Sequence, residues 1–383
     1  MSPCIMSTVA DDDCREYLKG VKLLHDDGVT NIPKKYILPF PDRPNNNNNN
    51  NNVTTTTTNK QQESSALIKL PVIDMAELQG PNRYMTIKSL SDACQSFGFF
   101  QVVNHQVPEK VISNMIDVGG RFFELPYEAR CKYMSSNMRA PVRCGTSFNQ
   151  NKDGVFCWRD FLKLTCDPHP SPPDDVLANW PESPIDLRKQ ASTYSKESNN
   201  LFVKLMDAIL ESLGLRDRNS HDKVDEMLKE CRKGSHLMVV NCYPPCPQPD
   251  LTLGMPPHSD YGFITLLLQD DVRGLQIQHQ GDWVTVDPIP NSFVVNVGDQ
   301  LEIFSNGLYR SVLHRVLANS KRLRTSIASL HAFPFDITVS PCEALVNRHG
   351  RKLYKDTCFA DFMAYASTHE LKGKDFLESR KLK

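Results

Sequence analysis

The sequence lacks long apolar runs, a leader-like start and an excess of charge of either sign. Apolar stretches of the 383-residue chain, such as that around Phe263–Leu268, are far shorter than the ~20 residues of a membrane-spanning helix. The start, MSPCIMSTVADDDCREY, has no basic segment followed by an apolar one. Lys and Arg number 44 against 45 Asp and Glu, so there is no basic surplus for nucleic acid. We expect a cytoplasmic or nuclear protein with no membrane or nucleic-acid partner.

Cysteine spacing also excludes several classes of site. The twelve cysteines are scattered, and no C-x-x-C pair occurs. Cys242 and Cys246 flank Pro244-Pro245 at a spacing that suits neither a zinc knuckle nor a thioredoxin-like pair. We therefore expect free thiols in a reducing compartment.

Composition changes along the chain. Eight consecutive asparagines, Asn45–Asn52, precede a threonine run, and such a polar tract cannot bury enough surface to become ordered. Beyond it the pattern is mostly helical, with Leu201, Leu205, Ile209 and Leu213 on one stripe of a long helix over 185–213. After Gly234, short β-rich runs follow one another at roughly the 8–12-residue spacing of an all-β sandwich or barrel.

These changes predict five regions. They are 1–40, an N-terminal helix over Asp12–His25 and an extended arm; 41–65, a disordered Asn/Thr-rich linker; 66–230, a helical region that includes strands over 67–75 and 97–105; 231–336, the β-rich domain; and 337–383, a C-terminal extension with a closing helix over 358–368.

Polar residues recur in pairs within the expected strands. Residues at i and i+2 of a strand share a face, so each pair projects to one side of its strand. The pairs are Asn241 with Tyr243, His258 with Asp260, and Arg324 with Ser326, and His314 adds a single histidine. A barrel interior that held all of these groups would be expensive to bury without a function.

Two histidines and one carboxylate are the ligand set of a non-haem Fe(II) facial triad, which leaves coordination positions open for substrates. A structural zinc site would instead be closed by four protein ligands. An arginine beside a hydroxyl suits a carboxylate, because both groups donate hydrogen bonds to it. The pattern thus indicates a metal and a carboxylic-acid cosubstrate.

The order and spacing of these motifs are more specific than any one of them. His258-Ser259-Asp260 is followed after 53 residues by His314 and after nine more by Arg324-Thr325-Ser326, and Asn241-Cys242-Tyr243-Pro244-Pro245-Cys246 stands upstream. In these elements the chain resembles the plant Fe(II)/2-oxoglutarate-dependent dioxygenases, a family that includes flavanone 3-hydroxylase, flavonol synthase and hormone hydroxylases. The resemblance runs from about residue 30 to the C-terminus.

The resemblance implies a fold, a reaction and a set of roles. The implied fold is a mainly β double-stranded β-helix (jelly roll, cupin-like) backed by N-terminal helices. The implied reaction oxidises a small molecule while 2-oxoglutarate and dioxygen are consumed and succinate and carbon dioxide are released, with ascorbate as the expected reductant. His258, Asp260 and His314 would bind Fe(II). Arg324, Ser326 and Tyr243, with Asn241 nearby, would bind 2-oxoglutarate.

The substrate side is less sharply defined. Pocket candidates are Phe148, Asn149, Leu330 and Phe333, and Phe156 and Trp158 are either stacking or packing residues. Arg143 is either a solvated charge or the receiver of a substrate carboxylate. His331, seven residues past Arg324, would point to the opposite strand face, and His105 is expected to be structural. The leading prediction is a monomer that hydroxylates, or desaturates, a flavonoid or phenylpropanoid.

Other interpretations stay open at this point. One is a hormone-modifying hydroxylase that acts on a gibberellin, a jasmonate or salicylate. Another is an iron oxidase that uses ascorbate and no 2-oxoglutarate. The remaining two are a metal-dependent hydrolase and a non-catalytic cupin-like binding protein.

Overall fold

The computed structural model describes residues 19–44, 69–135, 137–147, 153–166, 174–216, 221–369 and 373–383. Most of the predicted linker, the first part of the helix expected over Asp12–His25, and the substrate candidates Phe148 and Asn149 lie outside these residues.

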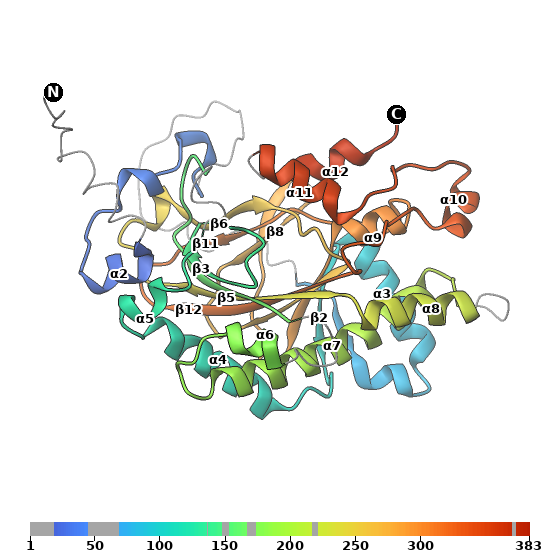
Figure 1. Ribbon diagram of the computed structural model, residues 1–383. Coiled ribbons are helices and arrows are strands. Elements are labelled where there is room, and N and C mark those ends of the chain that lie inside the picture. Colours follow the sequence, from blue (N-terminus) through green and yellow to red (C-terminus); the bar gives the residue numbers. More distant parts are fainter. Residues whose placement is uncertain are drawn as a thin grey trace, which may run out of the picture.

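Two β-sheets form the frame of the protein (Figure 1). The larger has eight strands in the order β1-β2-β10-β7-β12-β5-β4-β3, and the smaller has four in the order β6-β11-β8-β9. Their bounds are β1 Val72–Asp74, β2 Phe99–Val103, β3 Val142–Thr146, β4 Asp160–Thr165, β5 Ser235–Tyr243, β6 Leu253–His258, β7 Ile264–Gln269, β8 Leu275–His279, β9 Asp282–Thr285, β10 Phe293–Val297, β11 His314–Leu317 and β12 Arg324–Ala332. Strand pairs are antiparallel apart from β1 with β2. This is the predicted jelly roll.

The larger sheet takes strands from both halves of the chain. β2 pairs with β10, and β4 pairs with β5, so strands before residue 231 extend both edges of the sheet. Residue 231 is therefore no boundary between two separately folded units. The apolar pattern of β2 predicts a strand but not its partner, because β10 lies far from β2 in the sequence, in the second half of the chain.

Helices cover the outer face of the larger sheet. α4 and α7 pack on its central strands, and α3 and α8 pack on α7. The predicted stripe on α7 is confirmed, since Leu201, Leu205, Ile209 and Leu213 are all buried. The bounds of these helices are α3 Arg83–Ser96, α4 Glu109–Phe123, α7 Leu187–Ser212 and α8 His221–Arg232. Shorter helices are α2 Val21–Asp26, α5 Tyr127–Cys131 and α6 Asp174–Asn179.

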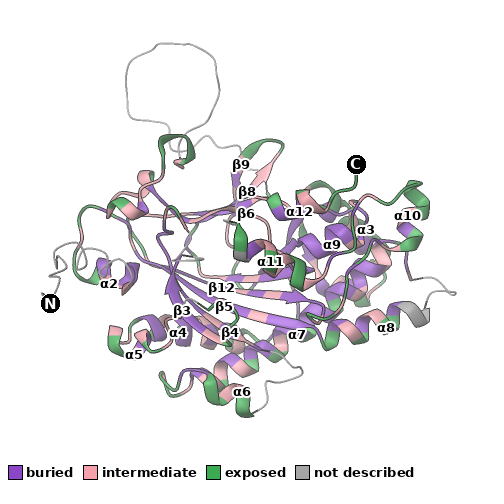
Figure 2. Ribbon diagram, turned by 45° about the horizontal axis from the view of Figure 1, so that its top comes forward, coloured by how far each residue is buried: buried purple, intermediate pink, exposed green. Residues whose placement is uncertain are grey.

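The C-terminal helices lie on the other side of the larger sheet from α7 (Figure 2). Just before α12, the Gly373 carbonyl accepts a hydrogen bond from Ser259 N at 3.2 Å, which ties this segment to the end of β6. The predicted closing helix is confirmed as α11, whereas α9 had not been predicted. The bounds are α9 Asp299–Phe304, α10 Glu343–His349, α11 Phe359–Thr368 and α12 Asp375–Arg380.

The N-terminal arm packs on the barrel through its own small core. Tyr36 contacts the rings of Phe156 and Trp158 edge-on, with centroids 5.8 and 5.5 Å apart. Trp158 is fully buried, and its Nε1 donates to the Pro244 carbonyl at 3.0 Å. Phe156 and Trp158 therefore pack the arm and do not line the cavity described below.

A buried carboxylate holds the arm to β4. The Asp160 side chain, 3% exposed, accepts hydrogen bonds from the backbone nitrogens of Val21 and Lys22 at 2.8 and 3.0 Å, and it lies 3.7 Å from the Arg130 guanidinium. Gly20 is required here, because a Cβ at this position would meet Asp160 Oδ2 at 2.6 Å.

Replacing Asp160 with alanine is expected to lower the free energy of unfolding by about 3 kcal/mol, because two backbone donors and the Arg130 charge lose their acceptor. Urea unfolding of the full chain measures this change. Asp117→Ala is the matched control, since Asp117 forms an exposed pair with Arg121 and its loss should change stability little. Equal effects of the two substitutions would contradict the role given to Asp160.

Candidate active site

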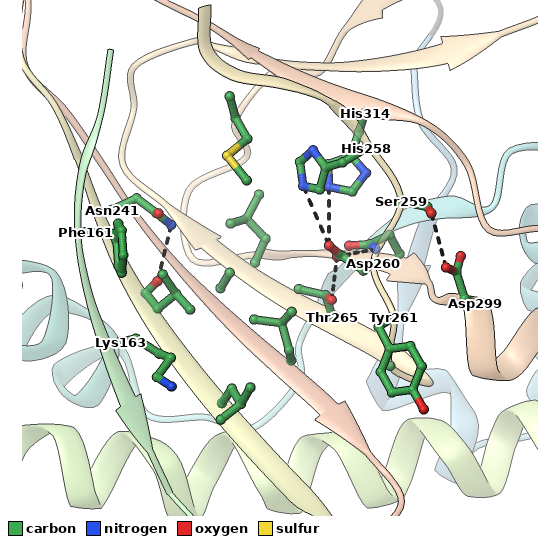
Figure 3. A pocket seen from close by; sticks show the side chains of 18 of the residues that line it. Phe161, Lys163, Asn241, His258, Ser259, Asp260, Tyr261, Thr265, Asp299 and His314 are labelled. Carbon is green, nitrogen blue, oxygen red and sulfur yellow. Dashed lines mark hydrogen bonds and ion pairs between the residues drawn. The ribbon is translucent and has the colours of Figure 1, made fainter. Parts of the chain in front are cut away.

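Three of the predicted residues meet at the end of β6. His314 opens β11 directly opposite His258, so the two rings lie side by side with centroids 4.1 Å apart. Asp260 follows two residues after His258, and its Oδ1 is 3.7 Å from His258 Nε2 and 3.8 Å from His314 Nε2 (Figure 3). The three ligand atoms lie within 4.8 Å of one another, and no other described His, Cys, Asp or Glu joins this cluster.

Hydrogen bonds orient each of these side chains. His258 Nδ1 and His314 Nδ1 lie 2.8 and 3.3 Å from the carbonyls of Pro256 and Val312, which favours Nδ1–H tautomers that present Nε2 toward Asp260. Thr265 Oγ1 and Asn296 Nδ2 donate to Asp260 Oδ2 at 2.6 and 2.8 Å, leaving Oδ1 toward the histidines.

The electrostatic environment of His258 and Asp260 favours the binding of a divalent metal. Burial, and next the charge of His314, lower the pKa of His258 to about 4, so its ring is neutral at neutral pH. Burial opposes ionisation of Asp260, but the two histidines and the hydrogen bonds from Thr265 and Asn296 hold its pKa below the ordinary value. Two imidazoles and one carboxylate fit Fe(II), and the lack of a fourth ligand among the described residues argues against a structural zinc site.

The predicted clamp lies on neighbouring strands. In the register of β12 with β5, Arg324 is opposite Tyr243 and Ser326 is opposite Asn241, so the four side chains share one face. Arg324 is 1% exposed and donates to the Val272 carbonyl, Gln269 Oε1 and Ser326 Oγ at 3.1, 2.8 and 3.4 Å. None of these acceptors is charged. A buried guanidinium with uncharged partners suits a carboxylate ligand.

The cluster and the clamp line one cavity of about 310 Å³. Its floor is apolar, with Leu237, Val239 and Leu330 from the larger sheet. Its other side carries aromatic rings of the C-terminal segment, namely Phe335, Phe359, Phe362, Tyr365 and Phe376. Tyr261 stacks on Phe362 with centroids 4.3 Å apart, which joins this aromatic group to the loop after Asp260.

The substrate-pocket predictions have mixed outcomes in the structure. Leu330 lines the cavity, but Phe333 lies in the core against Phe263, with centroids 4.5 Å apart. The cavity-lining positions of β12 alternate from Arg324 to Ala332, and Phe333, directly after the strand, falls on the opposite alternation. Arg143 is 4% exposed and lines the cavity, so it is not a solvated charge.

Two other histidines are structural, as predicted. His331 stacks on Phe202 of α7 at 4.4 Å, on the helical side of the sheet. His105 packs edge-on against Phe293, and its Nε2 lies 3.0 Å from the Asn291 carbonyl.

Sequence reasoning missed several residues that line the cavity. Thr265 and Asn296 are polar residues on the inner face of otherwise apolar strands, and that exception to the pattern is the signal that could have found them. The C-terminal aromatic rings carry no such signal, because aromatic residues of a short helix are usually core.

Family models match both halves of the chain. Residues 234–332 match the 2OG-Fe(II) oxygenase superfamily, and residues 70–183 match the N-terminal region described as "non-haem dioxygenase in morphine synthesis N-terminal". Within the described residues, no helix is both long and apolar enough to cross a bilayer.

Relatives match over most of the chain. Protein DMR6-LIKE OXYGENASE 1 of Arabidopsis thaliana is 39% identical over 344 residues, which cover 89% of this chain and 91% of the relative. Flavanone 3-dioxygenase 2 of Oryza sativa subsp. japonica is 38% identical over 296 residues, covering 77% and 82% of the two chains.

Among solved structures, JOX2 in complex with 2OG, Fe and JA aligns with a TM-score of 0.80 at 31% identity, covering 95% of this chain and 98% of that one. The rice dioxygenase for auxin oxidation aligns with a TM-score of 0.68 at 26% identity, covering 82% of this chain and all of that one. With a jelly roll, a His-Asp-His cluster and these relatives, the chain belongs to the 2OG-Fe(II) oxygenase superfamily and is an oxidoreductase dependent on iron and 2-oxoglutarate.

Proposed function

We propose that this enzyme hydroxylates, or desaturates, a small plant metabolite with a largely apolar, ring-containing body. The observation that carries the proposal is the shared cavity, in which the His-Asp-His cluster, the buried Arg324 and a set of aromatic rings all face the same space. Flavonoids and other phenylpropanoids fit the aromatic side of this cavity, and plant hormones are the alternative class. Among the similar proteins, a flavanone 3-dioxygenase supports the flavonoid class, and JOX2 in complex with JA supports the hormone class.

In this proposal His258, Asp260 and His314 hold Fe(II). Bound iron supplies the activation of dioxygen, which is coupled to the oxidative decarboxylation of 2-oxoglutarate to succinate and carbon dioxide. The protein supplies a neutral His258, an ionised Asp260 and two carbonyl-oriented rings. Thr265 and Asn296 keep Asp260 from rotating.

The clamp orients the cosubstrate. Arg324 and Ser326 donate to the distal carboxylate of 2-oxoglutarate, with the Tyr243 hydroxyl as a further donor and Asn241 beside them. The Arg324 guanidinium is already fixed by Val272 and Gln269 and lies 5.1 Å from the Tyr243 ring centroid, so little freedom is lost on binding. The apolar floor and aromatic side exclude water from the bound molecules.

Chelation of the metal is expected to abolish turnover, and Fe(II) should restore it while Zn(II) should not. The reason is that zinc can occupy a site of two histidines and a carboxylate but has no redox chemistry. The measurement is succinate release after chelation and addition of each metal, with ascorbate present throughout. Succinate release restored by Zn(II) alone would contradict iron-dependent oxidation at this site.

The substrate class is tested by a panel of flavonoids, phenolic acids, gibberellins and jasmonates, scored for the increase in succinate over the substrate-free rate. We expect members of one class to stimulate the release of succinate and to yield an oxidised product. If the substrate-free enzyme decarboxylates 2-oxoglutarate but no member of the panel stimulates it, the proposed substrate classes are wrong.

A further inference from the structure

Two glycines of the smaller sheet lie behind the clamp, on the side away from the cavity. Gly254 is the second residue of β6, and Gly274 immediately precedes β8. Strands β6 and β8 flank β11, and the Gly274 carbonyl accepts a hydrogen bond from Leu317 N of β11 at 2.8 Å. Both glycines are buried, and neither lines the cavity, although the residues that follow them, Met255 and Leu275, do.

The first glycine leaves room for the ring of Tyr243. A Cβ on Gly254 would stand 2.7 Å from Tyr243 Cδ1 and 2.9 Å from its Cε1, which is too close for two carbon atoms. The backbone of β6 is held in place on both sides of Gly254, because Leu253 and Met255 are register partners of β11. An added methyl group would therefore displace the tyrosine ring.

The second glycine leaves room for the stem of Arg324. A Cβ on Gly274 would stand 2.9 Å from Arg324 Cδ and 3.1 Å from its Nε. That nitrogen donates to the Val272 carbonyl at 3.1 Å, so the same backbone segment binds and borders one edge of the side chain. Asp270 fixes this segment, since its carboxylate accepts from the backbone nitrogens of Val272 and Thr325 at 3.0 and 2.5 Å. An added methyl group would therefore displace the arginine.

The backbone itself does not require glycine at either position. The φ angles of Gly254 and Gly274 lie outside the positive range that favours glycine, unlike the φ of 94° at Gly281. Alanine at these two positions would thus crowd the facing side chain without straining the backbone. The missing side chains serve the close approach of Tyr243 and Arg324.

We infer that Gly254 and Gly274 are positioning residues for 2-oxoglutarate, because they let Tyr243 and Arg324 lie against the backbone of the smaller sheet and so set the depth of the clamp. This inference rests on the proposed function, in which these two side chains bind the distal carboxylate. A guanidinium binds a carboxylate through parallel hydrogen bonds, and their geometry is lost when one group is displaced. The Arg324 guanidinium carbon lies 5.1 Å from the Tyr243 ring centroid, so displacement of one side chain also disturbs the other.

The test replaces each glycine with alanine in the full chain. Calorimetric titration of the Fe(II)-loaded protein without oxygen gives the Kd for 2-oxoglutarate, and succinate release gives KM and kcat separately. We expect Kd and KM to rise by about 10-fold in Gly254→Ala and in Gly274→Ala, because an extra methyl group in a packed contact displaces its neighbours. Iron affinity, and kcat at saturating 2-oxoglutarate, should change less than about 2-fold. The atoms nearest to either added Cβ belong to the clamp and to β11, not to the metal cluster.

The matched control is Gly119→Ala. A Cβ on Gly119 of α4 would stand 2.8 Å from Val240 Cγ1, which is as close as the contact at Gly254. Val240 lies three residues before Tyr243 on β5, so its side chain points to the helical face of the sheet and not to the cavity. This control adds the same group with the same crowding, and its Kd for 2-oxoglutarate should stay within about 2-fold of the wild-type value.

A double-mutant cycle tests whether Gly254 acts through Tyr243. Tyr243→Ala removes the ring that the added Cβ would meet, and the next neighbour is Val316 Cγ1 at 3.2 Å. In this background, Gly254→Ala should weaken binding by less than about 2-fold beyond Tyr243→Ala alone. The background also has room for the added methyl group, so the cycle stays informative if Gly254→Ala alone does not fold.

Two results would overturn the inference while the proposed function stands. One is wild-type binding of 2-oxoglutarate by either folded glycine variant, while Arg324→Lys binds it more weakly. The other is a Gly254→Ala substitution that weakens binding by the same factor with and without the Tyr243 ring. By contrast, Arg324→Lys and Tyr243→Ala proteins that bind 2-oxoglutarate as tightly as the wild type would contradict the proposed clamp itself.

Discussion

Alanine in place of Asp260 is expected to abolish both iron binding and succinate release. Loss of a residue that only orients a metal ligand typically lowers metal affinity or activity by about 10–100-fold. Loss of a ligand itself should therefore lower them by more than about 100-fold. The substitution also leaves Thr265 and Asn296 without their acceptor and brings two imidazoles together without a counter-charge. Iron content by elemental analysis and succinate release measure the two losses separately.

The control for this prediction is Asp271→Ala. Asp271 is an exposed aspartate that pairs with Arg322 outside the cavity. The Asp271→Ala enzyme should retain iron and activity. Asn296→Ala should give an intermediate loss, because it removes one donor to Asp260 while the ligand stays. An Asp260→Ala enzyme with wild-type iron content and turnover would show that the metal lies elsewhere.

Lysine in place of Arg324 is expected to raise the KM for 2-oxoglutarate by about 100-fold, with a smaller effect on kcat. Loss of one partner of a buried, hydrogen-bonded charge pair costs several kcal/mol in general, and one ammonium cannot bind a carboxylate in two places. Lysine also cannot hold the Val272 carbonyl and Gln269 while it contacts the ligand. The dependence of succinate release on the concentration of 2-oxoglutarate measures the change.

The matched control is Arg322→Lys, two residues earlier on the chain. Arg322 binds both oxygens of Asp271 at 3.0 and 2.7 Å, but the pair is exposed. Exposed pairs contribute little, so the KM for 2-oxoglutarate should not move. Equal behaviour of Arg322→Lys and Arg324→Lys, or an unchanged requirement for 2-oxoglutarate in the latter, would refute the clamp.

Much of the architecture can be predicted from the sequence because its local signals are strong. The period of α7 and the position of α11 follow from apolar spacing alone. The i, i+2 pairs predict shared strand faces, and the register of β12 with β5 does place Arg324, Tyr243, Ser326 and Asn241 on one face. These predictions need only neighbouring residues.

Other features depend on contacts between distant segments. The register of β11 with β6 that places His314 beside His258 has no local signal, and the family pattern supplied it instead. The sequence favours a solvated charge at Arg143 because nothing near it in the sequence predicts its burial. The contacts that bury it come from β4, the strand that carries Phe161. The error at Phe333 is different, because the same strand alternation that turns His331 away from the cavity applies to Phe333, which packs on Phe263.

The central claim is that oxidation of the substrate is coupled to decarboxylation of 2-oxoglutarate at the His258-Asp260-His314 cluster. Turnover under isotopically labelled dioxygen, with a substrate found in the panel, tests this claim directly. A hydroxylation should incorporate one labelled oxygen atom into succinate and the other into the product, with equal amounts of the two formed. Oxidised product that forms without succinate, or succinate that carries no label, would contradict it.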